Sequence, residues 1–113
     1  MTDLNKKTCV ACRVGAPLAT EEEIRSFLPQ IPEWKIIQID AVNHLTRKFK
    51  FKNFLDALAL TNKIGTLAET ENHHPALLTE WGSLEVSWWT HKIHGLHVND
   101  FIMAAKTDLL YEK

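Results

Sequence analysis

The chain has 113 residues, of which 45% are apolar and 24% are charged, and its formal net charge is −1 at pH 7. These values are typical of an ordinary globular protein, and we treat residues 1–113 as a single domain. The near-neutral charge provides no basic field for nucleic acid or an anionic membrane, and the apolar runs are too short to span a bilayer. The first residues lack the apolar stretch of a secretory signal, so we expect a cytoplasmic protein.

Residues 1–19 are predicted to form an irregular N-terminal arm. This arm contains both cysteines of the chain, Cys9 and Cys12, in the stretch C-V-A-C. A structural zinc site needs four ligands, and no second pair of this kind follows. No strand–helix pattern of a redox fold surrounds the pair either, so we assign it no chemistry.

The first half of the domain begins with a helix and continues with two strands. Thr20 precedes three glutamates, a capping-box spacing that predicts a short helix over residues 21–28, which Pro29 and Pro32 then end. Alternating side chains predict strands over residues 34–40 and 44–51.

The second half repeats this order with a much longer helix. Apolar and small residues recur at intervals of three and four from Phe54, Leu55 and Leu58 onward, which predicts an amphipathic helix over residues 54–71. Two strands over 76–81 and 84–91 follow, joined by a tight turn at Gly82–Ser83, and the last helix is expected over 98–111. The order of the elements predicts an α+β domain in which helices cover an antiparallel sheet.

Histidines provide the main chemical signal, because five of the six lie between positions 73 and 97. His73 or His74 could simply bond the open carbonyls at the end of the preceding helix. His91, His94 and His97 have an HxxHxxH spacing that could supply three ligands to a metal. Gly95 interrupts any continuous helical face among them, and no recognised ligand frame is present, so we favour no metal site.

Acid–base chemistry fits the histidines better. An imidazole titrates near neutral pH and can donate or accept a proton without a large pKa shift. Glu69 lies four residues before His73 and could orient its ring, as the acid of a hydrolase triad does. No serine or cysteine is placed as a nucleophile, so we predict proton transfer alone, as in a dehydration, hydration or isomerisation. The nearby Trp81, Trp88 and Trp89 could form a core, an interface or a wall for a flat heterocycle.

Seven residues at fixed spacing closely resemble the signature of the pterin-4a-carbinolamine dehydratases: Glu69, His73, His74, Pro75, Trp81, His91 and Asp100. A looser resemblance, which includes the stretches PEWKI and FKFKNFLDALAL, extends over about residues 17–111. The resemblance implies a four-stranded antiparallel sheet with three helices packed on one face. It also implies association into a homodimer or homotetramer.

The resemblance further implies an activity. Members of this family dehydrate a 4a-hydroxytetrahydropterin to the quinonoid dihydropterin without a metal or an organic cofactor, and so recycle the cofactor of aromatic amino acid hydroxylases. By resemblance, His73, His74 and His91 are catalytic, and loss of one should lower turnover without unfolding the domain. Substrate-binding or orienting roles fall to Glu69, Pro75, Trp81 and Asp100. The alternative is a non-catalytic dimerisation module, because animal members also serve a homeodomain transcription factor; the complete histidine set favours catalysis.

Overall fold

The computed structural model describes residues 4–6 and 17–112, so Cys9 and Cys12 lie outside the described residues. The regular elements, in chain order, are the 3₁₀ turn η1 (Leu4–Lys6), α1 (Glu21–Phe27), the 3₁₀ turn η2 (Leu28–Gln30), β1 (Lys35–Ile39), β2 (Val42–Lys50), α2 (Phe54–Glu71), β3 (Ala76–Glu80), β4 (Ser83–Trp88), the 3₁₀ turn η3 (His91–Ile93) and α3 (Val98–Glu112). The predicted order of helices and strands is confirmed. In this part of the chain, none of the helices combines the length and apolar character needed to cross a membrane.

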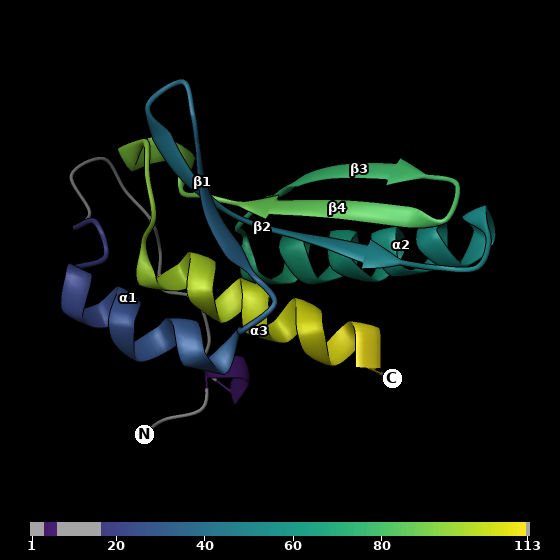
Figure 1. The fold of residues 1–113 in the computed structure, drawn as a ribbon, viewed down its shortest axis with the longest axis horizontal. Helices are drawn as coiled ribbons and strands as arrows, with labels where there is room; N and C mark the ends of the chain where they lie inside the picture. The colour runs from purple at the N-terminus through teal and green to yellow at the C-terminus, as the bar shows by residue number, and fades with distance from the viewer. Residues whose placement is uncertain (1–3, 7–16, 113) are drawn as a thin grey trace.

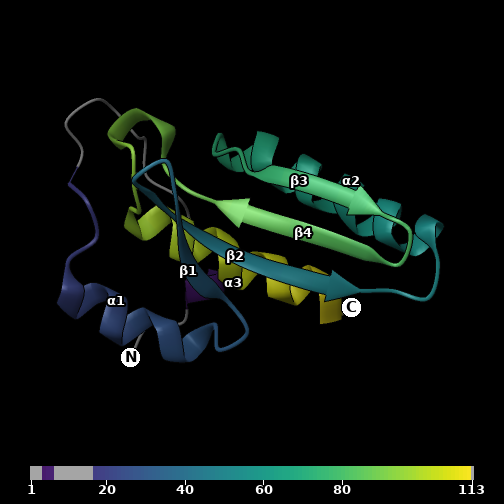
Figure 2. The same ribbon diagram turned by 45° about the horizontal axis from the view of Figure 1, so that its top comes forward.

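The four strands form one antiparallel sheet in the order β1-β2-β4-β3. In the central pair, Leu45 lies opposite Trp88 and Phe49 opposite Leu84. All four of these side chains are buried, because alternate residues of a strand point to the same face of the sheet. The helices lie on that face (Figures 1 and 2), which confirms the α+β arrangement with three helices on one side.

Helices α2 and α3 complete the core beneath the sheet. From α3, Phe101, Ile102 and Met103 are buried. Helix α1 packs beside α3, where the rings of Phe27 and Phe101 are 5.5 Å apart. Leu4 of η1 is also fully buried in this core, and η1 contacts α3, so at least this part of the predicted irregular arm is ordered against the domain.

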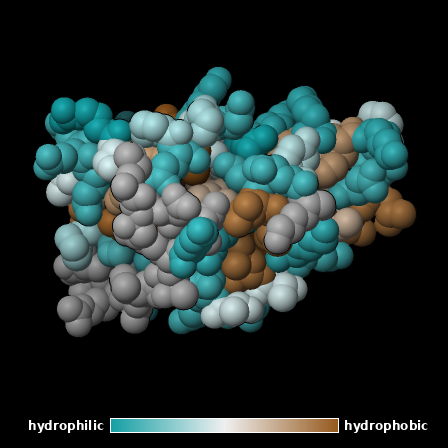
Figure 3. Space-filling view, turned by 90° about the horizontal axis from the view of Figure 1, so that it is seen from below, coloured by the Kyte–Doolittle hydropathy of each residue, from teal (hydrophilic) through white to brown (hydrophobic). Residues whose placement is uncertain are grey.

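Helix α2 has the predicted bounds, but the first apolar residues of the predicted periodic pattern do not face the core. Phe54, Leu55 and Leu58 are 44%, 71% and 37% exposed. The side chains of α2 that are buried are instead Ala57, Leu60, Ile64 and Ala68. The helix carries apolar residues on two sides, and periodicity alone does not say which side meets the sheet. Apolar side chains reach the surface on the face that Figure 3 shows, seen from below the view of Figure 1.

Two tight turns join the strand pairs. Asp40 and Ala41 connect β1 to β2, and both have positive φ, at 50° and 66°. Such turns match the right-handed twist of a hairpin, but they strain a residue that has a Cβ. Trp81 and Gly82 connect β3 to β4, and here the positive φ of 78° falls on a glycine. The antiparallel pairing places the start of β2 and the start of β3, which follows α2, beside the end of β4, and the histidines gather at this end of the sheet.

Candidate active site

The end of α2 turns His73 into the protein interior. Asn72 ends the helix in the left-handed conformation, with φ 53° and ψ 43°, which asparagine tolerates better than most residues. The backbone N–H of His73 then donates to the carbonyl of Ala68 at 3.1 Å. The helix end is therefore capped by backbone groups, and the His73 side chain is used elsewhere, with only 6% of the residue exposed.

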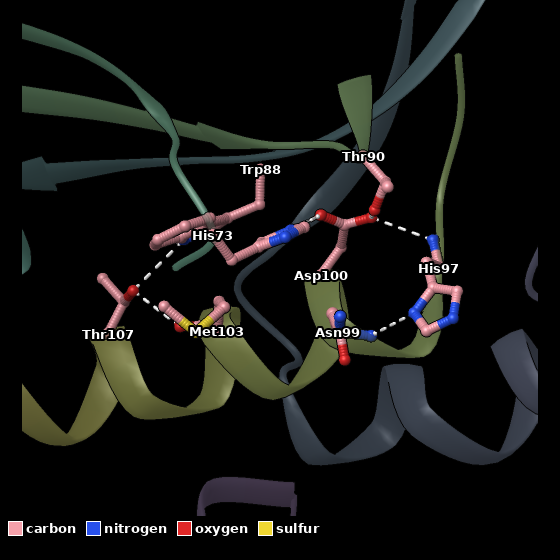
Figure 4. Close-up of polar contacts among 8 residues, drawn as sticks. All are labelled: His73, Trp88, Thr90, His97, Asn99, Asp100, Met103 and Thr107. Carbon is pink, nitrogen blue, oxygen red and sulfur yellow. Dashed lines mark hydrogen bonds and ion pairs between the residues drawn. The ribbon is translucent and has the colours of Figure 1, made fainter. Parts of the chain in front are cut away.

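The partner of His73 is the fully buried carboxylate of Asp100. Nε2 of His73 lies 2.7 Å from Oδ1 of Asp100. The other oxygen, Oδ2, accepts hydrogen bonds from the Thr90 hydroxyl at 2.8 Å and from the backbone N–H of His97 at 2.9 Å (Figure 4). A carboxylate can be buried at tolerable cost only when donors surround it in this way. Asp100 thereby ties the end of α2, the segment after β4 and the start of α3 to one point.

Trp88 holds the plane of the His73 ring. The two rings are stacked, with centroids 5.9 Å apart and an interplanar angle of 12°. Trp88 is itself fixed, because its Nε1 donates to the hydroxyl of Thr107 at 3.2 Å (Figure 4). If Nε2 of His73 carries the proton that faces Asp100, Nδ1 is the basic nitrogen of the neutral ring.

His97, to which we assigned no role from the sequence, forms the N-cap of α3. Its Nδ1 accepts a hydrogen bond from the backbone N–H of Asn99 at 3.0 Å, while Asp100 accepts from the backbone N–H of His97. The bond to Asp100 is that of a capping box, whereas the His97 ring caps the second N–H of the helix rather than the third. Burial is the main cause of a lowered pKa of His97. Asp100 opposes this shift, His73 adds to it and Glu23 opposes it. The lowered pKa favours the neutral ring, whose Nδ1 can accept a hydrogen bond. In the sequence, the signal for this cap was Asp100, three positions after His97. We did not predict the cap, because histidine is not a common N-cap residue.

His74 points away from His73, toward solvent. Its Nε2 bonds to Oε2 of Glu69, and the two side chains are 52% and 77% exposed. From the sequence we expected Glu69 to orient His73, which follows it by one helical turn. The left-handed Asn72 breaks that register, so Glu69 reaches His74 and Asp100 serves His73 instead.

His91 lies at the start of η3, exposed at the surface. Its ring stacks on Trp89, with centroids 4.4 Å apart. Strand β4 ends at Trp88, before the predicted limit at His91, and a bridge between Thr90 and Gly95 closes the loop that follows. Because Thr90 donates to Asp100, the backbone that carries His91 is tied to the same carboxylate as His73.

Two residues of the expected site take no part in these contacts. Trp81 is 73% exposed in the turn between β3 and β4. It lies at the opposite end of β4 from Trp88, roughly 20 Å away at the rise of an extended strand. Pro75 is half-buried in the short link between α2 and β3, where it separates the two elements. Within one chain, therefore, the structure brings Glu69, His73, His74, His91 and Asp100 to one end of the sheet and leaves Trp81 at the other.

The HxxHxxH stretch does not converge on a point. His91 and His94 are exposed, His94 in the left-handed conformation with φ 51°, whereas His97 is buried as the cap of α3. Across residues 4–6 and 17–112, no group of three or more histidine, cysteine, aspartate or glutamate side chains is placed to hold a metal ion.

The chain is similar to known proteins over nearly its full length. The family model for pterin 4 alpha carbinolamine dehydratase matches residues 17–110. Proteins of Syntrophotalea carbinolica and Saccharophagus degradans, both named "Putative pterin-4-alpha-carbinolamine dehydratase", are 61% and 59% identical; each match covers 99% of this chain, and 100% and 99% of the relatives. A crystal structure from Brucella melitensis, described as a transcriptional coactivator/pterin dehydratase, superposes with a TM-score of 0.74 at 29% identity, over 83% of this chain and 98% of that one. The chain belongs to the pterin-4a-carbinolamine dehydratase family.

Proposed function

We propose that the protein dehydrates a 4a-hydroxytetrahydropterin to the quinonoid dihydropterin by histidine acid–base catalysis. Membership of the dehydratase family supports the reaction class. The single observation that best supports histidine catalysis is the buried pair formed by His73 and Asp100, since an imidazole held by a carboxylate is a common way to orient a general acid or base.

The reaction requires two proton movements. The C4a–O bond breaks, and the leaving hydroxyl takes a proton from an acid and departs as water. A second proton leaves a ring nitrogen, whose electrons form the new double bond of the quinonoid product. The substrate and the product have the same oxidation state, so the proposed step needs no electron carrier, and we propose that no cofactor takes part.

Three imidazoles are available for these two transfers. His73 is fixed by Asp100 and Trp88, whereas His74 is paired with the exposed Glu69 and His91 rests on Trp89. We assign the proton transfers to this set, with Asp100 as a positioning residue because it is fully buried and contacts the imidazole rather than solvent. Each positioned acid or base contributes about 10²- to 10⁴-fold in rate.

The biological setting that we propose is recycling of the pterin cofactor of an aromatic amino acid hydroxylase in the cytoplasm. We further propose that the protein acts as a homodimer or homotetramer. The exposed Leu55 and Leu58 of α2 and the exposed Leu78 and Trp81 of the second hairpin support association, because large apolar side chains at the surface are typical of protein interfaces.

The alternative is a module that acts only through association. The Brucella melitensis structure is described as both a transcriptional coactivator and a pterin dehydratase, so both roles are named for that relative. A purely associating module has no need of a buried His–Asp pair, which is costly to desolvate.

The test is the rate at which the purified protein consumes a freshly generated 4a-hydroxytetrahydropterin, compared with the rate without protein. His91→Ala should lower kcat strongly. His94→Asn is the matched control: His94 is an exposed histidine of the same loop, and asparagine tolerates its left-handed backbone. The proposal fails if the wild-type protein does not exceed the uncatalysed rate, and association without catalysis would then support the alternative.

A further inference from the structure

Three aromatic rings from two strands and the following turn are stacked at the edge of the site. The ring of His44, on β2, lies against Trp89, with centroids 4.0 Å apart and an interplanar angle of 10°. Trp89 follows the last residue of β4, and its ring also stacks on His91 at 4.4 Å and 29°. His44 and Trp89 continue the register in which Leu45 lies opposite Trp88, so both side chains belong to the sheet face away from the helices.

Trp89 lies between the two imidazoles. The imidazoles of His44 and His91 lie 4.0 and 4.4 Å from the indole centroid, at 10° and 29° to its plane, and would overlap if they shared a face of the indole. They therefore occupy opposite faces. Because both faces of Trp89 are taken, this tryptophan does not offer a platform to a flat substrate and instead contacts both His44 and His91.

The two ends of the stack differ in burial. His44 is only 7% exposed, whereas His91 is at the surface. His44 is also held by the backbone of a central strand, since its neighbours pair with β1 on one side and β4 on the other. The stack therefore runs from a buried ring on a central strand to an exposed ring on the turn that follows β4.

The buried nitrogen Nδ1 of His44 does not explain the place of this ring. Its Nδ1 is buried and has no hydrogen-bond partner among the described residues. Burial lowers the pKa of His44, and the nearby His91 lowers it further while Asp100 opposes both, so the ring is neutral near neutral pH. A buried nitrogen without a partner destabilises the fold. What the ring supplies in this structure is its flat surface against Trp89.

We propose that His44 is a positioning residue that fixes the imidazole of His91 at the active site through the ring of Trp89. This inference rests on the proposed role of His91 in proton transfer. A catalytic group that moves by about 1 Å can lose on the order of 10²-fold in rate. Loss of the buried ring should therefore act mainly on kcat, because His91 would still be present but less well placed.

The test compares three variants. His44→Ala removes the ring, and we expect kcat to fall about 10- to 100-fold with a much smaller change in KM. His44→Phe keeps a flat ring and removes the unpaired nitrogen, and we expect it to restore most of the rate. Ile37→Ala is the packing control, because Ile37 pairs with His44 on the neighbouring strand but carries no aromatic ring; it should leave kcat unchanged.

A second readout does not depend on turnover. The Cε1–H proton of His91, assigned in NMR spectra by its loss in His91→Ala, should show an upfield ring-current shift from Trp89 in the wild type and in His44→Phe. His44→Ala should move this signal toward its position in an unstructured peptide.

The outcomes separate the two claims. An inactive wild-type protein contradicts the proposed function, and the NMR comparison alone then decides whether His44 positions His91. In an active protein, the inference is overturned by an unchanged kcat in His44→Ala, by an unchanged His91 signal in that variant, or by a phenylalanine variant as slow as the alanine variant.

Discussion

Replacing Asp100 by asparagine tests the buried pair with the least change in shape. The carboxylate of Asp100 faces three donors: the ring of His73 at 2.7 Å, the hydroxyl of Thr90 at 2.8 Å and the backbone N–H of His97 at 2.9 Å. Asparagine offers one acceptor and one NH₂ group at the same positions. At the position of Oδ1 the NH₂ group faces His73, which must change its tautomer to accept. At the position of Oδ2 it faces the Thr90 hydroxyl, which can turn to accept, and the backbone N–H of His97, which cannot.

An NH₂ group at the position of Oδ2 should lower the unfolding free energy, and one at the position of Oδ1 should lower kcat. If the NH₂ group faces the backbone of His97, a buried N–H is left unpaired at a cost of about 1–3 kcal/mol in unfolding free energy. If it faces His73, the ring is held with its proton on the other nitrogen, and the contribution of a positioned acid–base group, about 10²- to 10⁴-fold, is lost. We expect kcat to fall within that range and the protein to remain folded.

The assay is stopped-flow dehydration of a 4a-hydroxytetrahydropterin, with the melting temperature measured on the same samples. Asp108→Asn is the matched control. Asp108 is a largely buried carboxylate on the same helix, about 12 Å further along at the rise of an α-helix, where it bonds to Arg47 and Trp34. This variant should keep the wild-type kcat. A folded Asp100→Asn protein with wild-type kcat, or an Asp108→Asn protein that is equally slow, would refute the role of the His73–Asp100 pair.

Three further predictions concern stability. Ala41→Gly should raise the unfolding free energy by about 0.5–1 kcal/mol in urea denaturation, because the left-handed strain of about 1–2 kcal/mol exceeds the entropy cost of glycine; a lower midpoint would contradict this. The pKa of His97 is lowered in the fold, so the unfolded chain binds a proton more readily, and the unfolding free energy should fall as the pH drops below 6.5. His97→Asn, which keeps a cap, should reduce the dependence of the unfolding free energy on pH, and an unchanged dependence would refute this prediction. His73→Ala should lower the melting temperature, because it strips a donor from buried Asp100, whereas His74→Ala should change it little; equal effects would contradict the assignment.

The last of these predictions revises an expectation from the sequence. The sequence suggested that either histidine of the adjacent pair could be removed without loss of stability. The structure places His73 in the interior and His74 at the surface, because the left-handed residue between α2 and His73 redirects the chain. His73 and His74 are neighbours in the sequence, but only His73 is expected to contribute to the stability of the fold.

Strand and helix positions could be predicted because each depends on a local pattern. The alternation of Leu45, Arg47 and Phe49 is confirmed as one face of β2, and the periodic stretch of α2 is confirmed in its bounds. The inner face of α2 could not be predicted, because the choice between Leu58 and Leu60 depends on how the helix rotates against the sheet. That rotation is set by tertiary packing.

The site could be predicted only in part, for a similar reason. Spacing along the chain indicated which residues belong to one family pattern, but not which of them meet in space. The hairpin carries Trp81 to the end of β4 that is far from the histidines. Thr90, which no pattern singled out, and His97, considered only as a metal ligand, bond directly to Asp100. The His44–Trp89 stack depends on strand register, which appears only when β2 and β4 are paired.

The most direct test of catalysis by the buried pair is single-turnover dehydration of a 4a-hydroxytetrahydropterin by the intact protein and by His73→Gln, which keeps a polar side chain toward Asp100. We predict that the wild-type protein accelerates the reaction well above the uncatalysed rate, and that the folded glutamine variant loses about 10²- to 10⁴-fold of kcat. A glutamine variant as fast as the wild type would contradict the claim that His73, held by Asp100, moves a proton in this reaction.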